Sequence, residues 1–496
     1  MPFILGLITS FSLPPYNFVI INFIAFPTLL IFFLNHYQNR KLIAFKIGWF
    51  FGFGYFISSI YWITHSLTFD NTFKILIPFA LILIPAFLAI FYGLITFFCA
   101  FFNLKKNIST ILIFIIIFSV IEFFRGYIIG GFPWNLIVYS WTNYISFLQI
   151  LPLIGTYAFN LLSLTFFLIP TILFFSINKK IKIFVILSTI FLMLINYIYG
   201  SNIINNYGKI SEKSLGFTIK IISPKINISR FYEVNNPEEI LKELIQLSSP
   251  VDSENTIFIF PEGMLTNIYL EDLDIYTKLF KENFSEKHKI VLGINSNENS
   301  KIYNTMVVLN NEAKVLAKYK KNKLVPFGEF LPFEDIFFKF GLKKITQGYQ
   351  SFSSDNNRQV FNINNINFLP LICYEIIYSG KLNNNKQNFL FILNISEDGW
   401  FGSSVGINQH FSHSIFRAIE EGKNLIRSSN NGISAHINPK GQIINGLEST
   451  SKGVIKIKSF KEVKKTLFNE HGNKLFLYFL VIYIILFFFQ KKREIQ

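Results

Sequence analysis

Three short segments of the sequence each carry reactive side chains close to an apolar run. TIFIFPEG contains Glu262, FLPLICYE contains Cys373, and KYKKNKLVPFGEF (318–330) is rich in lysine. A carboxylate can take the proton of a thiol, the thiolate can attack an ester carbonyl, and a lysine ammonium group can stabilise the oxyanion that forms. These residue types form a complete set for acyl transfer without a histidine. Chemistry alone does not choose among the lysines of the third segment, which are Lys318, Lys320, Lys321 and Lys323.

Each of these residues also has an ordinary structural interpretation. A glutamate after a strand is most often a loop carboxylate, and a cysteine after an apolar strand most often belongs to the core. The joint occurrence of the three types favours a site over these interpretations. The second cysteine, Cys99, lies in an apolar run far from Cys373, so we expect no disulfide between them.

Other polar patterns fit structural roles better than catalytic ones. GSSVG matches G-x-S-x-G around Ser404, but loop residues precede it where a nucleophile elbow needs a strand. His410 and His413 are spaced for one helix face without a third ligand at metal-like spacing, so we expect no metal site. Glu122 and Arg125 lie near the end of an apolar segment, where an i,i+3 ion pair is the simplest interpretation and a place beside a lipid headgroup is the alternative.

The segments with the reactive residues belong to a region, 206–468, in which short β-rich runs alternate with helical patterns. Such alternation is typical of an α/β layered domain, in which strand ends present functional groups to a crevice. Apolar runs such as FLFILNI fit a sheet that is covered on both faces. We expect strands at 215–223, 256–260, 289–294, 305–309, 366–373 and 389–395, and helices at 237–248, 269–284 and 408–427.

The rest of the chain has the composition of a membrane protein. Of the 496 residues, 51% are hydrophobic and 18% are aromatic, which is unusual for a water-soluble domain. Lys and Arg outnumber Asp and Glu by 46 to 30, but they form short clusters between apolar runs. This placement indicates membrane topology and argues against nucleic acid as a partner.

Eight apolar segments are candidates for membrane helices. A bilayer core of about 30 Å needs roughly 20 apolar residues. The segment 3–13 is short and ends at Pro14-Pro15, and we expect it to form a hairpin with the second span. It lacks a basic n-region and a cleavage site, so we expect no signal peptide. The other segments are 17–34, 43–66, 74–101, 108–125, 156–176, 183–200 and 474–490.

The basic clusters predict the orientation of these spans. With eight spans, the clusters at Arg40-Lys41, Lys105-Lys106, Lys179-Lys180-Lys182 and Lys491-Lys492-Arg493 fall on one side. Because Lys and Arg collect on the cytoplasmic side, we expect both termini in the cytoplasm and residues 201–473 outside. The expected domains are a membrane domain (1–205), a catalytic domain (206–468), and a last span with a basic tail (469–496).

The order and wording of the reactive segments resemble a known family. PEG, Y-x-K-x-x-L and C-Y-E occur in the order typical of the nitrilase superfamily of carbon–nitrogen hydrolases, and LVPFGEF resembles the apolipoprotein N-acyltransferases within it. NISEDGWFGSSVGINQHF resembles the family's segment after the nucleophile, and FGFGYFISSIYW and FFRGYIIGGFPW resemble its membrane spans. The resemblance implies a polytopic α-helical membrane domain with an α-β-β-α sandwich. It also places the family's lysine at Lys321.

The resemblance implies a role for each matching residue. Glu262 would be the general base, Lys321 the oxyanion stabiliser and Cys373 the nucleophile. Glu329 would orient the lysine or assist proton transfer. The residues implied to shape the pocket or bind substrate are Tyr374, Glu375, Tyr232 and Trp400. Two positions depart from the family's pattern. Tyr232 lies where the family usually has a tryptophan, and Ser396-Glu397-Asp398 replaces a stretch that usually contains asparagine.

The implied reaction has two steps. Cys373 takes an acyl chain from a phospholipid, and the amino group of an S-diacylglyceryl-cysteine on an apolipoprotein then attacks the thioester. The expected setting is the bacterial inner membrane, with the catalytic domain on the periplasmic side and no cofactor. One alternative is a membrane-tethered amidase of the nitrilase type, against which LVPFGEF and the spans weigh. The other is a lipid transporter with a decayed hydrolase domain, against which the intact Glu–Lys–Glu–Cys set weighs.

Overall fold

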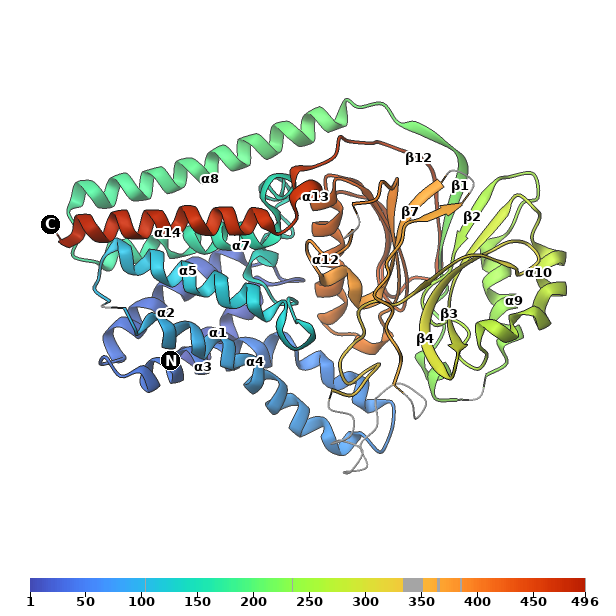
Figure 1. The fold of residues 1–496 in the computed structure, drawn as a ribbon, viewed down its shortest axis with the longest axis horizontal. Helices are drawn as coiled ribbons and strands as arrows, with labels where there is room; N and C mark the ends of the chain where they lie inside the picture. Colours follow the sequence, from blue (N-terminus) through green and yellow to red (C-terminus); the bar gives the residue numbers. More distant parts are fainter. Residues whose placement is uncertain (103, 234, 333–350, 364–365, 384–385, 496) are drawn as a thin grey trace. The chain divides into compact units, whose positions relative to one another are not determined.

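The computed structural model describes residues 1–102, 104–233, 235–332, 351–363, 366–383 and 386–495 (Figure 1). The described chain divides into two compact units. The first contains residues 1–64, 75–209 and 466–496, and the second contains residues 65–74 and 210–465. Residues 65–74, which connect two helices of the first unit, thus belong to the second unit.

The first unit is a bundle of apolar helices. Within the described ranges, seven helices are long and apolar enough to cross a membrane, and a shorter apolar helix covers Pro2–Ser12. Many Phe, Leu and Ile side chains stay exposed on these helices, as is expected where lipid replaces water outside the bundle. The prediction of a polytopic membrane protein is confirmed. The seven helices are α2 (Asn22–His36), α3 (Lys41–Ser59), α4 (Ile77–Cys99), α5 (Ile108–Arg125), α7 (Leu151–Leu168), α8 (Lys179–Gly208) and α14 (Lys474–Ile495).

The short first helix, α1 (Pro2–Thr9), contacts the following span α2, with which we expected it to form a hairpin, and packs more extensively against α3. Glycines permit this contact. A Cβ atom on Gly6 would lie 2.0 Å from the carbonyl oxygen of Phe51, and one on Gly54 would lie 2.1 Å from that of Phe3. The two backbones therefore touch, as in other small-residue contacts between membrane helices.

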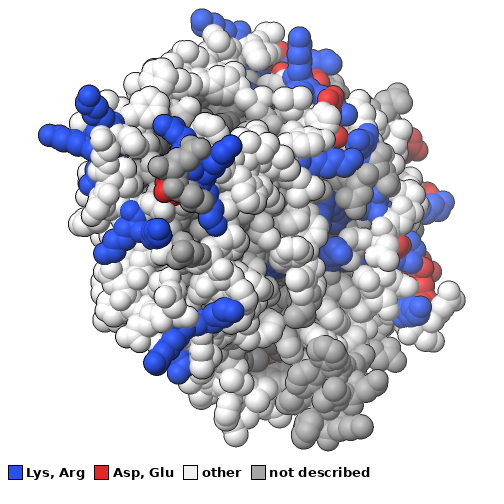
Figure 2. Space-filling model, turned by 60° about the vertical axis from the view of Figure 1, so that its left-hand side comes forward, with Lys and Arg blue, Asp and Glu red and all other residues white. Residues whose placement is uncertain are grey.

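The charged residues on α5 form the predicted i,i+3 ion pair. Arg125 Nη2 lies 2.7 Å from Glu122 Oε2, and both side chains are buried inside the bundle. Arg125 also donates to the carbonyl oxygen of Phe132. Pairing offsets the cost of burying both charges. Figure 2 shows Lys and Arg in separate groups among uncharged side chains on the face in view.

The second unit contains two six-stranded sheets within the described residues. Their orders are β12-β1-β2-β3-β4-β5 and β11-β10-β9-β8-β7-β6. The sheets face each other, since Ser428 Oγ on β9 donates to the carbonyl oxygen of Ile222 on β1 at 3.0 Å. The strands are β1 (Lys213–Ser223), β2 (Thr256–Ile259), β3 (His288–Glu298), β4 (Lys301–Leu309), β5 (Val315–Lys320), β6 (Phe361–Ile363), β7 (Ile366–Ile372), β8 (Phe391–Glu397), β9 (Asn424–Asn430), β10 (Ser434–Ile437), β11 (Ile443–Leu447) and β12 (Gly453–Phe460).

Helices cover the outer face of each sheet, which gives the predicted α-β-β-α layers (Figure 1). On the first sheet, α9 (Pro237–Ser248) and α10 (Thr277–Asn283) bury their apolar sides against β1 to β4. The Asn236 side chain caps α9 by accepting from the Glu238 N–H at 3.0 Å. On the second sheet, α12 (Gly406–Glu421) packs against β9 and β10.

The six expected strands and the helix at 237–248 are confirmed, but two other helices differ from the prediction. The helix expected at 408–427 ends at Glu421, because Gly422 adopts a left-handed conformation (φ 62°) and the chain then enters β9. The segment expected as a helix at 269–284 begins as a 3-10 helix, Leu270–Tyr276, before α10. Helical periodicity did not mark these ends.

Candidate active site

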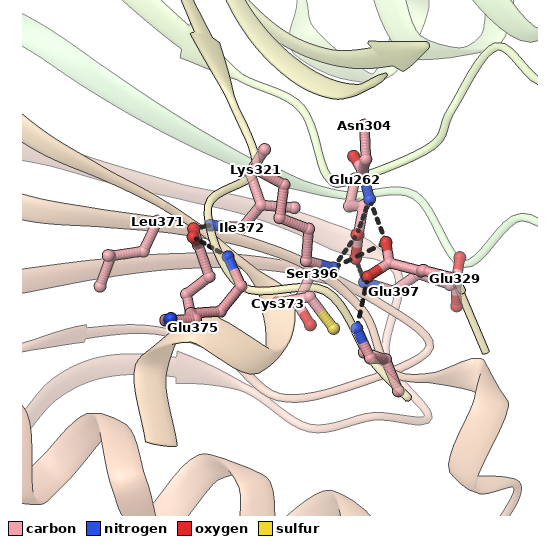
Figure 3. A network of polar contacts seen from close by, with 12 residues as sticks. Glu262, Asn304, Lys321, Glu329, Leu371, Ile372, Cys373, Glu375, Ser396 and Glu397 are labelled. Carbon is pink, nitrogen blue, oxygen red and sulfur yellow. Dashed lines mark hydrogen bonds and ion pairs between the residues drawn. The ribbon is translucent and has the colours of Figure 1, made fainter. Parts of the chain in front are cut away.

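The structure brings Glu262, Lys321, Cys373 and Glu329 together at the ends of strands (Figure 3). Glu262 follows β2, Lys321 follows β5 and Cys373 follows β7. Lys321 Nζ lies 2.9 Å from Glu329 Oε1 and 3.3 Å from Glu262 Oε1. All four side chains are buried, and Lys321 is only 1% exposed. The chemistry proposed from the sequence is therefore available at one place.

A further polar residue, Asn304 on β4, joins the two glutamates. Its Nδ2 donates to Glu262 Oε1 at 2.7 Å and to Glu329 Oε1 at 2.8 Å. Its carbonyl oxygen accepts from the Lys321 backbone N–H at 2.8 Å. Nothing in the sequence predicts this residue, since its position depends on the register between β4 and β5.

Backbone groups fix the remaining oxygens of the two glutamates. Glu262 Oε2 accepts from the Glu397 N–H at 3.0 Å, and Glu329 Oε2 accepts from the Val325 N–H at 2.8 Å. Each carboxylate is thus held on both sides. Such preorganised groups keep their positions while charge moves during a reaction.

Cys373 sits at a sharp turn between β7 and a 3-10 helix, Cys373–Ile377. Its φ is 49°, which is uncommon for a residue other than glycine. Residues held in such conformations cluster at functional sites, where the surrounding structure maintains the strain. Asn394 contributes to this hold, because its Nδ2 lies 3.5 Å from the Cys373 carbonyl oxygen.

The electrostatic surroundings keep the thiol neutral. Burial and then the charge of Glu262 raise the pKa of Cys373 well above its ordinary value, while Lys321 opposes this shift. Burial by itself would lower the pKa of Lys321, but Glu262, Glu329 and Cys373 raise it well above its usual value. Lys321 is therefore a fixed ammonium ion, and the thiolate must be generated by proton transfer.

Glu375 anchors the lysine loop to the cysteine turn. One of its oxygens accepts from the Ile372 N–H at 2.8 Å, and the other accepts from the Asn322 N–H at 2.8 Å. Arg358 pairs with this carboxylate at 2.5 Å, and the Tyr319 hydroxyl donates to it at 2.6 Å. Glu375 is fully buried, so its contacts fix the loops that carry the reactive groups.

A second buried network lies behind Cys373. The Ser396 hydroxyl donates to Asp398 Oδ1 at 2.7 Å, and Ser396 is one of the groups that lower the pKa of Cys373 against the raising effect of burial. Arg427 Nη2 and His410 Nδ1 lie 2.8 and 2.9 Å from the Asp398 carboxylate. Burial would raise the pKa of Asp398, but Arg427 and His410 lower it below its usual range.

The residues of the rival motifs also have defined surroundings. His410 belongs to the Asp398 network, and within the described ranges no group of three His, Cys, Asp or Glu residues is arranged to hold a metal ion. Ser404 lies in a loop between the 3-10 helix Gly399–Phe401 and α12, without a strand directly before it. Cys99 and Cys373 are both free.

Tyr232 and Trp400 belong to an aromatic cluster beside the Glu262 loop. Their ring centroids lie 6.3 Å apart, and Phe69 packs against both at 6.0 and 5.9 Å. Phe231 contacts Trp400 at 4.9 Å, and it also lies beside Gly263, where a Cβ atom would meet its ring at 2.8 Å. Phe69 comes from the connection between α3 and α4, far away in sequence, and no motif predicts it. Tyr374 packs instead on Tyr378, with ring centroids 5.5 Å apart.

Comparisons with known proteins show which families this chain is similar to. The family model of the apolipoprotein N-acyltransferase N-terminal domain matches residues 5–169, and that of carbon–nitrogen hydrolase matches residues 243–458. The chain is 30% identical to the apolipoprotein N-acyltransferase of Agrobacterium fabrum, covering 91% of this chain and 87% of that protein. It is 28% identical to that of Brucella melitensis biotype 1, with coverages of 91% and 88%. An amidase of the nitrilase superfamily from Nesterenkonia AN1 superposes with a TM-score of 0.37 at 15% identity, over 51% of this chain and 94% of that one.

Proposed function

Since the chain belongs to the apolipoprotein N-acyltransferase family, we propose that Cys373 carries an acyl group as a thioester between a phospholipid donor and a lipoprotein acceptor. The observation that carries this proposal is the buried ammonium group of Lys321, paired with Glu262 and Glu329 beside a cysteine at a strained turn. The proposed base, Glu262, and the proposed oxyanion donor, Lys321, are thus in contact, and the proposed nucleophile, Cys373, lies beside them (Figure 3).

In the first half-reaction, Glu262 takes the proton from the Cys373 thiol, and the thiolate attacks the ester carbonyl of a phospholipid. The negative charge that develops on the carbonyl oxygen is stabilised by Lys321. When the ester C–O bond breaks, the proton on Glu262 passes to the leaving alkoxide. The products are a lysophospholipid and an acyl thioester on Cys373.

In the second half-reaction, the acceptor is the α-amino group of a diacylglyceryl-cysteine at a lipoprotein N-terminus. This amine attacks the thioester carbonyl, Glu262 takes a proton from the nitrogen, and Lys321 again stabilises the oxyanion. The C–S bond breaks, an amide forms, and the proton on Glu262 returns to Cys373. Both substrates are lipid-anchored, so attachment to a membrane unit confines enzyme and substrates to one layer and raises their effective concentration.

The neighbouring residues support this chemistry by positioning. Asn304 and Glu329 fix the relative positions of Lys321 and Glu262. Glu375 joins the loop after Lys321 to the turn at Cys373. We assign Tyr374, Tyr232 and Trp400 to the walls of the substrate pocket, where aromatic rings would keep water from the thioester. We place the catalytic unit on the periplasmic side of the bacterial inner membrane and both termini in the cytoplasm, on the basis of the basic clusters.

Mass spectrometry of the full-length protein in phospholipid vesicles tests the covalent step. Without an acceptor, we expect one hydroxylamine-sensitive acyl adduct on Cys373, which disappears when a diacylglyceryl lipopeptide is added. Cys373→Ala should form no adduct, whereas Cys99→Ala, its matched control, should behave as the wild type. Absence of the adduct in the wild type would contradict the proposal. Hydrolysis of short amides without transfer to the lipopeptide would favour the amidase instead, and retention of function by Cys373→Ala in the cell would favour the transporter.

A matched lysine pair tests the oxyanion role. Lys321→Met should slow thioester formation by about 10²–10³, the usual loss when one oxyanion donor is removed. Lys320→Met is the control, because Lys320 precedes Lys321 in the chain but pairs with Glu298 at 2.6 Å on another part of the sheet. Equal rates in the two variants would remove Lys321 from the mechanism.

A further inference from the structure

Helix α8 is attached to the membrane unit near its two ends. Near its C-terminal end, Gly200 approaches Ser146 on α6 (Ile145–Leu148) so closely that a Cβ atom would lie 1.8 Å from the Ser146 carbonyl oxygen. Near its start, Lys182 Nζ donates to the carbonyl oxygen of Leu173 at 3.2 Å, in the 3-10 helix Ile169–Phe174. Between these contacts, α8 stands apart from α7.

A groove of about 240 Å³ occupies the space between these two helices. Its walls are apolar, with Leu153, Leu162 and Phe166 from α7 and Leu192, Ile195 and Tyr199 from α8. Several of these side chains are exposed on the outside of the bundle, so the groove opens toward lipid. Its volume is below the roughly 300–1,000 Å³ of pockets for drug-sized ligands, which suits part of one acyl chain rather than two.

One polar side chain, Asn196, lies in this apolar wall. It is 5% exposed, and its Nδ2 donates to the carbonyl oxygen of Phe147 at 3.1 Å. Its Oδ1 is buried and has no hydrogen-bond partner among the described residues. An unsatisfied buried acceptor is unfavourable, so this atom is suited to a ligand that brings a hydrogen-bond donor.

The position of Asn196 along α8 indicates the half of the bilayer in which it lies. It lies 14 residues after Lys182, and a helix rises about 1.5 Å per residue, so about 21 Å separates it from that basic end. In a hydrocarbon core of about 30 Å, Asn196 belongs to the half of the bilayer opposite the basic cluster. The groove therefore opens to the leaflet that, in the orientation proposed above, faces the catalytic side.

We propose that this groove binds a lysophospholipid, with its single acyl chain between α7 and α8 and its free glycerol hydroxyl donating to Asn196 Oδ1. A diacyl phospholipid has no such hydroxyl and has a second chain to accommodate. The source of the ligand rests on the proposed function, since the first half-reaction releases a lysophospholipid into the same membrane. The groove would hold this product after it leaves Cys373.

Native mass spectrometry of full-length Cys373→Ala in detergent tests the site without turnover. We expect one palmitoyl lysophosphatidylethanolamine to be retained at least tenfold more tightly than dipalmitoyl phosphatidylethanolamine. Leu162→Trp or Leu192→Trp, which fill the groove from opposite walls, should abolish retention, whereas Leu194→Trp, on an exposed part of α8, should not. Asn196→Leu should reduce the preference for the lysolipid by about tenfold, as expected for one buried hydrogen bond.

Two results would overturn the inference. One is equal retention of both lipids by the parent protein, and the other is unchanged lysolipid retention in both groove-filling variants. If one of those variants does not fold, as judged by its melting temperature, the other decides. Thioester formation on Cys373 is measured separately in the wild type, so loss of lysolipid binding with an intact thioester refutes only the groove. Binding without any thioester refutes only the proposed function.

Discussion

Replacing Asn304 by leucine removes the side chain that bridges the two glutamates without changing its approximate size. The backbone bond from Lys321 to the Asn304 carbonyl oxygen stays available, so the register of β4 and β5 should persist. What disappears are two hydrogen bonds to carboxylates, at 2.7 Å to Glu262 and 2.8 Å to Glu329. The substitution thus disturbs the positions of Glu262, the proposed base, and of Glu329, which pairs with Lys321.

The expected loss follows from the value of these bonds. A hydrogen bond to a charged group contributes about 1.5–3 kcal/mol. The bond to Glu262 acts directly on the group that moves the proton, whereas the bond to Glu329 acts only through Lys321. Counting the Glu262 bond alone, and assuming that its full value is needed in the transition state, thioester formation should slow by about 10- to 150-fold.

Single-turnover transfer from a fluorescent phospholipid measures this rate, and the melting temperature checks the fold. Asn297→Leu, an exposed change on the neighbouring strand β3, is the control and should leave the rate unchanged. Asn304→Asp should be slower than Asn304→Leu at neutral pH, because it adds a third carboxylate, and it should recover as the pH falls and the acid becomes a donor. A folded Asn304→Leu variant within threefold of the wild-type rate would refute the bridging role.

Three further predictions address the surroundings of Cys373. Burial and then Glu262 raise the pKa of Cys373, so Glu262→Gln should shift the pH dependence of thiol alkylation by iodoacetamide to lower pH. A pH dependence that is unchanged or shifted to higher pH would show that Glu262 does not raise this pKa. Arg358→Met should leave the buried Glu375 carboxylate without its charge partner and destabilise the catalytic unit by about 3–5 kcal/mol, measured as a lower unfolding midpoint; an unchanged midpoint would argue against the anchor. Ser396→Ala should slow thioester formation by about two- to tenfold and, because it removes a buried hydrogen bond to Asp398, should also lower the unfolding midpoint; a lower midpoint with an unchanged rate would assign Ser396 to the fold alone.

Glu262 and Cys373 could be singled out as candidates because each follows a predicted apolar strand, and this local order is visible along the chain. Lys321 follows β5, a mostly exposed strand that periodicity did not predict, so only the resemblance to the family's motif distinguished it from the neighbouring lysines. Asn304, Arg358 and Phe69 could not be found in this way, since they meet their partners only after strands pair and loops close.

The same distinction holds for the elements. The helix at 237–248 has an asparagine cap, a proline in its first turn and an amphipathic pattern, so its limits were predicted correctly. Near 421 the helical pattern ran on through Gly422 into residues that are buried on both sides in β9. Burial of an entire segment removes the polar face from which periodicity is recognised, and a single glycine then carries the only signal for the end of the helix.

The arrangement of charges explains how such a reactive site can be buried. With both glutamates ionised, Glu262, Glu329 and Lys321 together carry one net negative charge, which favours a neutral Cys373 thiol. Transfer of the thiol proton to Glu262 moves the charge to sulfur without changing the total. Attack on the ester moves it again, to an oxygen beside Lys321. Because each proposed step relocates one charge inside the site and none adds a second, the reaction needs no water to compensate it, and the thioester can form where water is excluded.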